Sequence, residues 1–580
     1  MPRTPARLFA LLLLLLPTVA GAQSSAIISN KDRHHPVYAA NGMVASQEAR
    51  ATKVGVDILA RGGNAIDAAV AVGFTLAVTL PRAGNLGGGG FMMVHHKGSG
   101  ETLALDYREM APKQAHRDLY LDKNGNVDKA KARFSHASVG VPGTVAGLVE
   151  AHRRYGSLPL GEVMAPAIAL AQNGIKVTPG LARSLTSRQK RLSKWPASAA
   201  IFYRPDGSLY QIGETLVQSD LAKSLRRIAA TQGRDFYAGE TAKAIAAEMR
   251  RHDGLISLAD LAAYKPVWRQ PAWGSYRGHK IASMPPPSSG GIHLIQMLNM
   301  LEGYPLTTMG HNSADSLHTM VEAMKLAYAD RARHLGDPDF WQVPLKGLTS
   351  KAYAKALAAG IDPARARPSV EIKHGNPAPY ESNETTHFSI MDGLGNVVSN
   401  TYTLNFSFGT GIVAAGTGIL LNNEMDDFSA KPGVPNAFGL VGGEANAIQA
   451  GKRPLSSMTP TIVFKDDQLL LATGSPGGSR IITMVLQILL NVIDHGMNIA
   501  EATAAPRIHH QWLPDKLFLE QGLSPDTLTL LAARGHNLTP SRAAGSVQSV
   551  MAVMAVMQSA SGGFYGASDT RSIGALAAGY

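Results

Sequence analysis

The hydrophobic pattern of the sequence changes at one place, and the change divides the chain into two parts. Before it, apolar residues recur mostly at helical spacing, as in 142–265 and Ser313–Leu335. Pro363 to Ser382 then contain four prolines and few apolar residues, which is typical of an exposed, mobile linker. After the linker, apolar and polar residues alternate from Thr385 to Met391, which predicts a β-strand. The pattern therefore favours layered α and β structure with mainly antiparallel hairpins, built by two segments.

Capping and turn residues predict several boundaries. Ser46 can cap a helix that runs to about Arg61, and Asn64 can start an Ala/Val-rich helix that ends at Leu80 before a proline. A turn at 392–396 joins the strand after the linker to a returning strand. Further strands are expected at Phe91–His95, Val397–Leu404, Gly418–Asn422, Thr461–Phe464 and Leu469–Thr473, and a helix at Ser479–Asp494.

The first 22 residues predict export. Arg3 and Arg7 precede an apolar stretch from Leu8 to Leu16, and the small residues Ala20-Gly21-Ala22 form a cleavage site. These are the three parts of a secretory signal peptide, so a periplasmic protein without a membrane span is expected. The net charge of +12 is scattered, and export argues against nucleic-acid binding. A mild positive field instead favours anionic substrates.

The chain contains no cysteine. Disulfides, thiolate metal sites and cysteine nucleophiles are therefore excluded, and any nucleophile must be oxygen or nitrogen. The adjacent pairs His34-His35 and His509-His510 lack helical i,i+4 spacing, and no carboxylate spacing near them suggests a metal, so no metal and no cofactor are expected.

Thr385 is the candidate nucleophile because it stands between the linker and a strand. If the chain is cut between Glu384 and Thr385, the new α-amine can accept the proton of the threonine's own hydroxyl. Taken alone, the local pattern is explained better by an ordinary strand start. Three other features favour catalysis. The returning strand carries the alternating polar residues Thr401, Thr403 and Asn405. Residues 474–480 form a strand-to-helix turn whose backbone amides can hold an oxyanion. Two further loops, 422–427 and 455–458, carry carboxylates and hydroxyls.

These residues occur in longer strings that recur in one family. The sequence closely resembles the bacterial γ-glutamyltranspeptidases of the N-terminal-nucleophile hydrolase superfamily over essentially the whole mature chain. The strings that carry the resemblance are Asp106-Tyr107-Arg108-Glu109, Gly87–Phe91, Thr385-Thr386-His387, Gly409-Thr410-Gly411, Leu421-Asn422-Asn423, Met425–Phe428, Pro454–Met458 and Gly474–Arg480.

The resemblance implies a precursor that cuts itself. Its parts would be a signal peptide (1–22), a large subunit (23–384) and a small catalytic subunit (385–580), which together form one four-layer αββα sandwich of α+β class. The donors would be glutathione and other γ-glutamyl compounds. The acceptor would be water, an amino acid or a dipeptide.

The resemblance also implies roles for single residues. Thr385 would attack the γ-carbonyl and form an ester, and Thr403 would activate it. Arg108 would grip the donor's α-carboxylate, as a guanidinium can do bidentately. The donor's α-carboxylate would also bind Ser456 and Ser457. Its α-ammonium would bind Asn405, Glu424 and Asp427. The oxyanion hole would consist of the backbone amides of Gly477 and Gly478.

Two alternatives and two departures stand beside this interpretation. A same-fold acylase for glutaryl or β-lactam amides would not need the predicted ammonium ligands, and a periplasmic solute-binding protein would be one uncut, repeated chain. The resemblance implies that the segment Lys431–Gly443 is a lid over the donor pocket. This segment carries Phe438, where many bacterial relatives have Tyr, so the lid would lack one hydrogen bond. Thr570 stands where Pro is usual, and only a small local effect on stability is expected.

Overall fold

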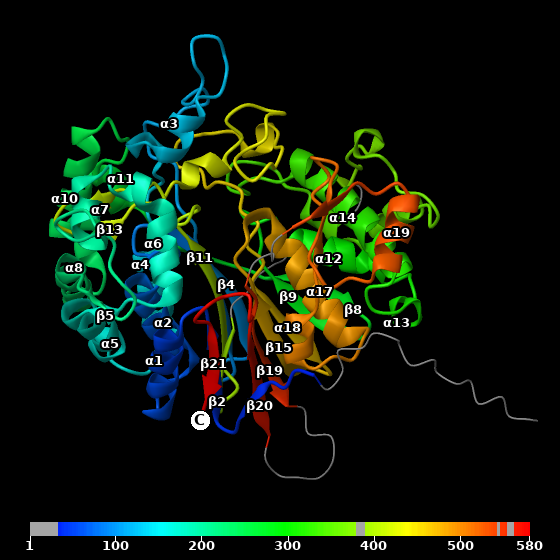
Figure 1. Cartoon of the computed structure of the whole chain (residues 1–580), viewed down its shortest axis with the longest axis horizontal. Helices are drawn as coiled ribbons and strands as arrows, with labels where there is room; N and C mark the ends of the chain where they lie inside the picture. Colours follow the sequence, from blue (N-terminus) through cyan, green and yellow to red (C-terminus); the bar gives the residue numbers. More distant parts are fainter. Residues whose placement is uncertain (1–32, 379–388, 542–545, 554–561) are drawn as a thin grey trace, which may run out of the picture.

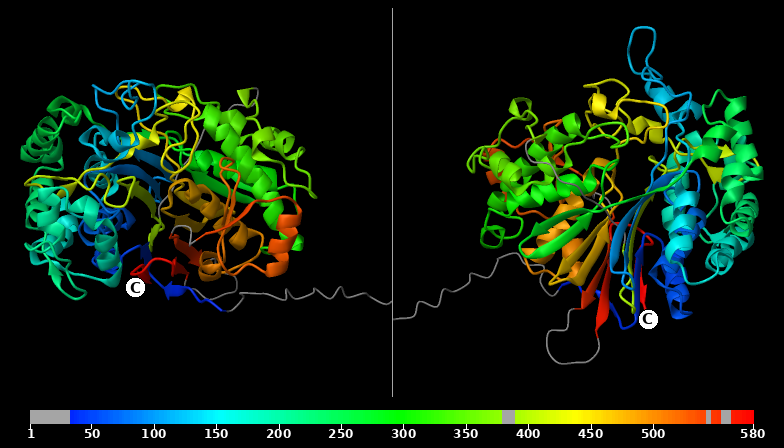
Figure 2. Two further views of the ribbon diagram at one scale, coloured as in Figure 1. Left: turned by 45° about the horizontal axis from the view of Figure 1, so that its top comes forward. Right: turned by 180° about the vertical axis from the view of Figure 1, so that it is seen from behind.

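Two antiparallel sheets stack face to face, and helices cover both outer faces (Figures 1 and 2). The structure is a computed structural model that describes residues 33–378, 389–541, 546–553 and 562–580. The four layers follow one another as helices, sheet, sheet and helices, so the predicted αββα sandwich is confirmed. Glu384 and Thr385 lie outside the described residues.

One seven-stranded sheet has strands from the second half of the chain at its centre. Strands from the first half stand at both of its edges. Its order is β1 (Val37–Ala39), β20 (Gly563–Ser568), β19 (Gln548–Val553), β15 (Gln468–Gly474), β14 (Thr461–Lys465), β9 (His279–Ser283) and β8 (Ala272–Tyr276).

The other seven-stranded sheet mixes the two halves as well. The hairpin β10–β11 of the second half is inserted between β2 and β3 of the first half. The order is β21 (Leu576–Gly579), β2 (Gly42–Ser46), β10 (Ile390–Asp392), β11 (Val397–Thr403), β3 (Gly89–His96), β4 (Glu101–Tyr107) and β7 (Val267–Arg269). Apolar side chains such as Met43, Met93, Ile462 and Val550 form the core between the sheets.

The helix α2 (Ala65–Thr79) shows how sequence sets the outer layers. Asn64 caps it, and Asp67 returns a hydrogen bond to the Asn64 backbone. Every residue of α2 is buried, because it is packed against other helices and β11. The other long helices on this side are α1 (Ala49–Ala60), α4 (Thr144–Tyr155), α5 (Leu160–Asn173), α6 (Pro179–Leu192), α8 (Ser219–Ala230) and α10 (Glu240–Arg251).

A second group of helices covers the sheet that contains β15. It comprises α12 (Gly290–Leu301), α14 (Ala314–His334), α16 (Lys351–Ala358), α17 (Ile481–Ile493), α18 (Ile499–Ala504) and α19 (Pro525–Ala533). The shorter helices are α3 (Lys129–Phe134), α7 (Pro196–Phe202), α9 (Arg234–Ala238), α11 (Leu258–Ala263), α13 (Leu306–Met309) and α15 (Leu345–Thr349). Small sheets are formed by β5 (Ile175–Lys176) with β6 (Thr215–Leu216), by β12 (Val413–Ala414) with β13 (Ile419–Leu420), and by β16 (Ile508–His509), β17 (Leu517–Leu519) and β18 (Leu538–Pro540).

Three expectations need correction. The first long helix is capped by Glu48 rather than Ser46, because the Glu48 carboxylate accepts from the amides of Arg50 and Ala51. The strand expected at 418–422 is only the two-residue β13. The α-helix expected from Ser479 begins at Ile481, after the 3-10 turn η6 (Gly478–Arg480).

The linker prediction is also wrong for part of 363–378. Ala366 and Ile372 are buried, and the Ser369 carbonyl accepts a hydrogen bond from the Trp512 indole. A few anchoring side chains and backbone contacts thus dock a segment whose composition is typical of an exposed chain. Among the described residues, no helix is both long enough and apolar enough to cross a membrane.

Candidate active site

The predicted site residues of the described chain line one cavity of about 190 Å³. This is many times the space that one water needs, so a ligand of amino-acid size can enter. The cavity lies where β4 and β11 end and where three loops meet. Its lining includes Arg108, Thr403, Asn405, Glu424, Asp427, Phe438, Ser456, Ser457, Gly477 and Gly478.

Arg108 lies at the centre of the polar wall. It directly follows β4, and its side chain is only 1% exposed. One guanidinium nitrogen contacts Glu424, and the other lies 2.6 Å from Asp427 Oδ2. Its Nε donates to the Pro454 carbonyl at 3.1 Å. Arg108 therefore pairs with two of the three predicted ammonium ligands, Glu424 and Asp427.

The turn η4 (Glu424–Asp427) is positioned by Asn422. The Asn422 amide group donates to the carbonyls of Gly87 and Gly140, both at 2.8 Å. Its side-chain oxygen accepts from the amides of Gly140 and Glu424. The buried Asn422 side chain thus has all its hydrogen-bonding groups satisfied and connects η4 to loops of the first half. These bonds explain why an asparagine follows Leu421.

The acidic groups around Arg108 share a buried environment. Burial raises the pKa of Glu424 well above its usual range, although Arg108 acts to lower it. Burial likewise raises the pKa of Glu109 to about 7, and the Glu109 carboxylate lies 3.6 Å from Arg108. Three carboxyl groups around one guanidinium leave an uncompensated negative charge, so the Glu109–Glu424 pair retains a proton near neutral pH.

Ser456 and Ser457 form another part of the polar wall. The Ser457 hydroxyl accepts from Arg331 at 3.2 Å, and Arg331 also donates to Ser289 at 2.9 Å. Arg331 lies near the end of α14, is buried, and lines the cavity. The sequence analysis missed this second cation, because an Arg in the last turn of a helix is common and carries no signal of its own.

The end of β11 brings the predicted helper residues together. The Asn405 amide donates to the Thr403 hydroxyl at 2.8 Å, and the Asn405 side chain donates to the Asn423 carbonyl at 3.0 Å. Asn405 adopts a φ of 70°, a left-handed conformation that Asn tolerates better than most residues. This turn fixes both side chains at the cavity wall.

Gly477 and Gly478 form the turn that follows β15. Their φ angles are 150° and 57°, which L side chains rarely adopt. A Cβ atom at Gly478 would lie 2.7 Å from Cδ1 of Phe438, so glycine also allows the lid ring to approach. Phe438 packs edge-on against Phe406 with ring centroids 5.8 Å apart. The Phe438 ring of the predicted lid therefore rests directly on the predicted oxyanion turn.

Comparisons with known proteins identify the family. The family sequence model described as Gamma-glutamyltranspeptidase matches residues 51–579. This chain belongs to that family. It is 57% identical to the glutathione hydrolase proenzyme of Escherichia coli strain K12 over 551 residues, covering 95% of this chain and 94% of that protein. It is also 38% identical to the acylase ACY 1 proenzyme of Pseudomonas sp. strain V22, covering 89% of this chain and 90% of that protein.

Solved structures agree with this family fold. The cephalosporin acylase of Bacillus halodurans has a TM-score of 0.83 at 29% identity and covers 97% of this chain and 99% of its own. The gamma-glutamyltranspeptidase of Helicobacter pylori has a TM-score of 0.57 at 44% identity and covers 58% of this chain and 96% of its own. As a gamma-glutamyltranspeptidase family member, the chain is an enzyme with the N-terminal-nucleophile hydrolase fold.

Gln511 is another residue of this family member that the sequence analysis missed. Its amide nitrogen donates to the Phe438 carbonyl at 3.0 Å and to the Leu513 carbonyl at 3.2 Å. Its oxygen accepts from Ser479 at 2.7 Å and hydrogen-bonds His509 at 3.0 Å. Gln511 thus connects the lid to the residue after Gly478. Only the fold reveals this role, because it joins three segments that are far apart in the sequence.

The adjacent histidines have ordinary partners in the fold. His509 bonds Thr483 at 2.8 Å as well as Gln511, and His510 lies 3.2 Å from Asp515. In the described part of the chain, two other groups contain the residue types that hold a metal: His136 with Glu248 and His252, and His318 with Glu322 and His536. The active-site cavity contains neither group.

Proposed function

We propose that this protein is a self-processing periplasmic γ-glutamyltransferase and hydrolase whose donor is glutathione or a related γ-glutamyl compound. The observation that carries the proposal is the guanidinium of Arg108 held between Glu424 and Asp427 in the wall of the cavity. A wall that presents a buried cation and buried anions side by side suits a zwitterion. The α-amino-acid end of a γ-glutamyl group is such a zwitterion.

The two charged groups of the donor bind to different residues of the cavity wall. The α-carboxylate bonds to Arg108, Ser456 and Ser457. The α-ammonium bonds to Asn405, Glu424 and Asp427. Because the ligand supplies one charge of each sign, the existing ion pairs are exchanged for new ones without leaving a charge unpaired. The γ-carbonyl then points toward the Gly477–Gly478 turn.

The nucleophile is Thr385. Thr403 is the last residue of β11, lines the cavity and accepts a hydrogen bond from the Asn405 amide at 2.8 Å. Its position in the cavity wall supports the expected role of Thr403 as the hydrogen-bonding partner that activates the nucleophile.

The reaction then proceeds through an ester. The Thr385 hydroxyl oxygen attacks the γ-carbonyl carbon, and its proton passes to the α-amine of the same residue. The amide C–N bond breaks, the leaving amine takes the proton, and the amides of Gly477 and Gly478 bind the oxyanion. Water or the amine of an acceptor attacks the ester, which releases glutamate or a new γ-glutamyl amide and restores the hydroxyl.

A matched pair of substrates tests this function against the acylase alternative. γ-Glutamyl-p-nitroanilide and glutaryl-p-nitroanilide differ only in the α-amino group. We expect strong preference for the γ-glutamyl compound. In Asp427→Asn this preference should shrink, since one ammonium partner loses its charge. Equal rates with both substrates would instead identify a glutaryl acylase.

Processing is tested separately with Thr385→Ala and Thr385→Ser. The Ala variant should remain one folded chain without γ-glutamyl transfer, and the Ser variant should retain some of both activities because the hydroxyl remains. N-terminal sequencing of the smaller fragment of the parent protein should begin at Thr385. Normal cleavage of the Ala variant would refute this assignment of the nucleophile.

A further inference from the structure

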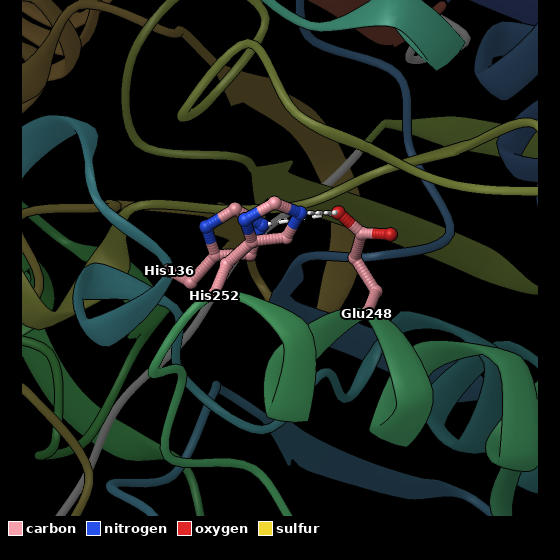
Figure 3. Close-up of side chains that lie close together, drawn as sticks. All are labelled: His136, Glu248 and His252. Atoms are coloured by element: carbon pink, nitrogen blue, oxygen red, sulfur yellow. Dashed lines mark hydrogen bonds and ion pairs between the residues drawn. The ribbon is translucent and has the colours of Figure 1, made fainter.

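Three potential metal ligands meet away from the active-site cavity (Figure 3). His136 belongs to the 3-10 turn η1 (His136–Ser138), Glu248 lies in the last turn of α10, and His252 follows the end of that helix. Both histidines direct Nε2 toward Glu248 Oε1, at 3.1 Å from His136 and 3.6 Å from His252. Their rings stack with centroids 4.5 Å apart.

We propose that His136, Glu248 and His252 bind one zinc ion. Zn²⁺ bonds of about 2.0–2.2 Å to nitrogen and oxygen set the edge of a tetrahedral site near 3.3 Å. The distances from Glu248 Oε1 to Nε2 of His136 and to Nε2 of His252, 3.1 and 3.6 Å, lie on either side of this value. Two imidazoles and one carboxylate are an established type of zinc ligand set, with water as the fourth ligand.

Two of the three ligands are buried, and the third is accessible to solvent. His136 and Glu248 are buried, whereas the His252 side chain is 44% exposed. The buried pair is therefore fixed by the fold. The exposed side at His252 admits the metal and its water.

Neighbouring groups orient the ligands. Arg251 lies 3.2 Å from Glu248 Oε2, so the other carboxylate oxygen, Oε1, faces the histidines. The Trp195 ring meets both imidazoles edge-on. The cations facing the group are Arg251 and Lys194. The Arg251 side chain is 56% exposed and that of Lys194 stacks on Trp195, so water screens Arg251 while Lys194 is held against the indole.

The second group of this kind is less suited to a dication. His318, Glu322 and His536 are all buried, and the Lys325 ammonium lies 2.8 Å from Glu322 Oε1. An ion there would be placed beside a buried positive charge with little screening. His136, Glu248 and His252 are therefore the group to which we assign zinc.

Zinc binding would stabilise a segment that is connected to the active site. The segment after η1 is connected to the cavity wall through Asn422: the Gly140 amide donates to Asn422, which also accepts from the Glu424 amide in η4. A zinc ion would tie this segment to α10. It would raise thermal stability without contacting the donor. This inference does not depend on the proposed γ-glutamyl chemistry.

The test uses the whole purified enzyme after treatment with a chelator. Zn²⁺ binding is measured by titration calorimetry, and Co²⁺ is used as a visible-absorption probe of tetrahedral coordination. We expect one equivalent of Zn²⁺ and a rise in Tm. His252→Ala should lose that equivalent and the rise in Tm. Glu248→Gln should weaken binding, and His116→Ala, which removes an exposed histidine elsewhere, should bind like the parent.

Circular dichroism of the metal-free variants shows whether they are folded, and His252→Ala removes only an exposed side chain. The proposal is overturned if the parent binds no equivalent of Zn²⁺. It is equally overturned if folded His252→Ala binds the same number of equivalents with the same affinity as the parent.

Discussion

At the scale of single residues, Arg108 depends on its guanidinium shape. Its nitrogens contact Glu424, Asp427 and the Pro454 carbonyl from one planar group. A lysine ammonium keeps the charge but cannot make this set of contacts. Arg108→Lys should process normally and lose about 1.5–3 kcal/mol of donor binding, which corresponds to a roughly 10- to 150-fold increase in the donor KM.

Arg117→Lys is a matched control for this experiment. Arg117 forms an ion pair with Glu444 at 3.1 Å, and solvent reaches both side chains, which are 34% and 58% exposed. This variant should leave the donor KM unchanged, since exposed pairs contribute little. Steady-state kinetics with a γ-glutamyl anilide gives both values, and an unchanged KM in Arg108→Lys would contradict the role of Arg108.

The proton held by the Glu109–Glu424 pair gives a second prediction. Burial raises the pKa of Glu109 to about 7. Below this pH Glu109 is protonated and the cavity is less negative, so it attracts an ammonium group less. Above this pH Glu109 is ionised and ammonium binding improves. The affinity for L-glutamate should therefore fall by up to about tenfold per pH unit as the pH drops below 7.

Glu109→Gln provides the comparison, because glutamine stays neutral at every pH. Its affinity for L-glutamate should be weak and should depend less on pH between 6 and 8. Inhibition constants for L-glutamate give the profile without requiring the Thr385 amine to react. A flat profile for the parent protein would show that the pair does not titrate in this range.

Sequence alone predicted many of the polar residues that line the cavity, but not how they pair with one another. Arg108, Ser456 and Gly477 stand in long motifs, so their place in the site was predictable. The contacts from Arg108 to η4 join residues 316 and 319 positions apart, and such contacts depend on the complete fold. Arg331 and Gln511 escaped notice for the same reason, because neither stands in a recognisable local pattern.

At the scale of elements, strong local signals were reliable and tertiary contacts changed the rest. α2 begins at its predicted cap because Asn64 and Asp67 satisfy each other's backbone amides. The expected strand at 418–422 is shorter because Gly418 has a φ of 71°, outside the extended region. Part of the linker is docked because Ala366 and Ile372 are buried, and such distant packing has no local sequence signal.

The hydrogen bonds that hold the predicted lid can be changed by a single substitution at Gln511. Gln511 donates to the Phe438 carbonyl and accepts from Ser479. In Gln511→Glu the acceptor oxygen remains, but the donor to the lid is lost and a carboxylate faces a carbonyl. Each lost hydrogen bond costs about 0.5–1.5 kcal/mol, enough to raise the open population several-fold.

We expect Gln511→Glu to process normally and to direct more of the γ-glutamyl enzyme to water. Phe438→Tyr should act in the opposite direction, since its hydroxyl can add a hydrogen bond to the closed lid. Partitioning between water and a fixed dipeptide acceptor measures both. Identical partitioning of Gln511→Glu and the parent would show that packing of Phe438 alone holds the lid.

At the scale of the whole molecule, cleavage before Thr385 would not create two independent domains. In the sheet with β10, strands of the second half stand next to β2 and β3 of the first. In the other sheet, β14 pairs with β9 and β20 pairs with β1. Removing either part would expose unpaired strand edges and the core between the sheets. Each fragment therefore depends on the other for its fold.

The processed protein should unfold as one unit. We expect a single calorimetric transition in which both fragments unfold together, and co-elution of the fragments at 1 M salt, because backbone ladders and buried apolar area rather than surface charge join them. The uncut Thr385→Ala chain is the matched control and should elute at the same volume. Residues 385–580 expressed alone should be unfolded or aggregated. Two separate transitions, or release of a folded small fragment by salt alone, would show that the interleaved sheets do not set the stability of the molecule.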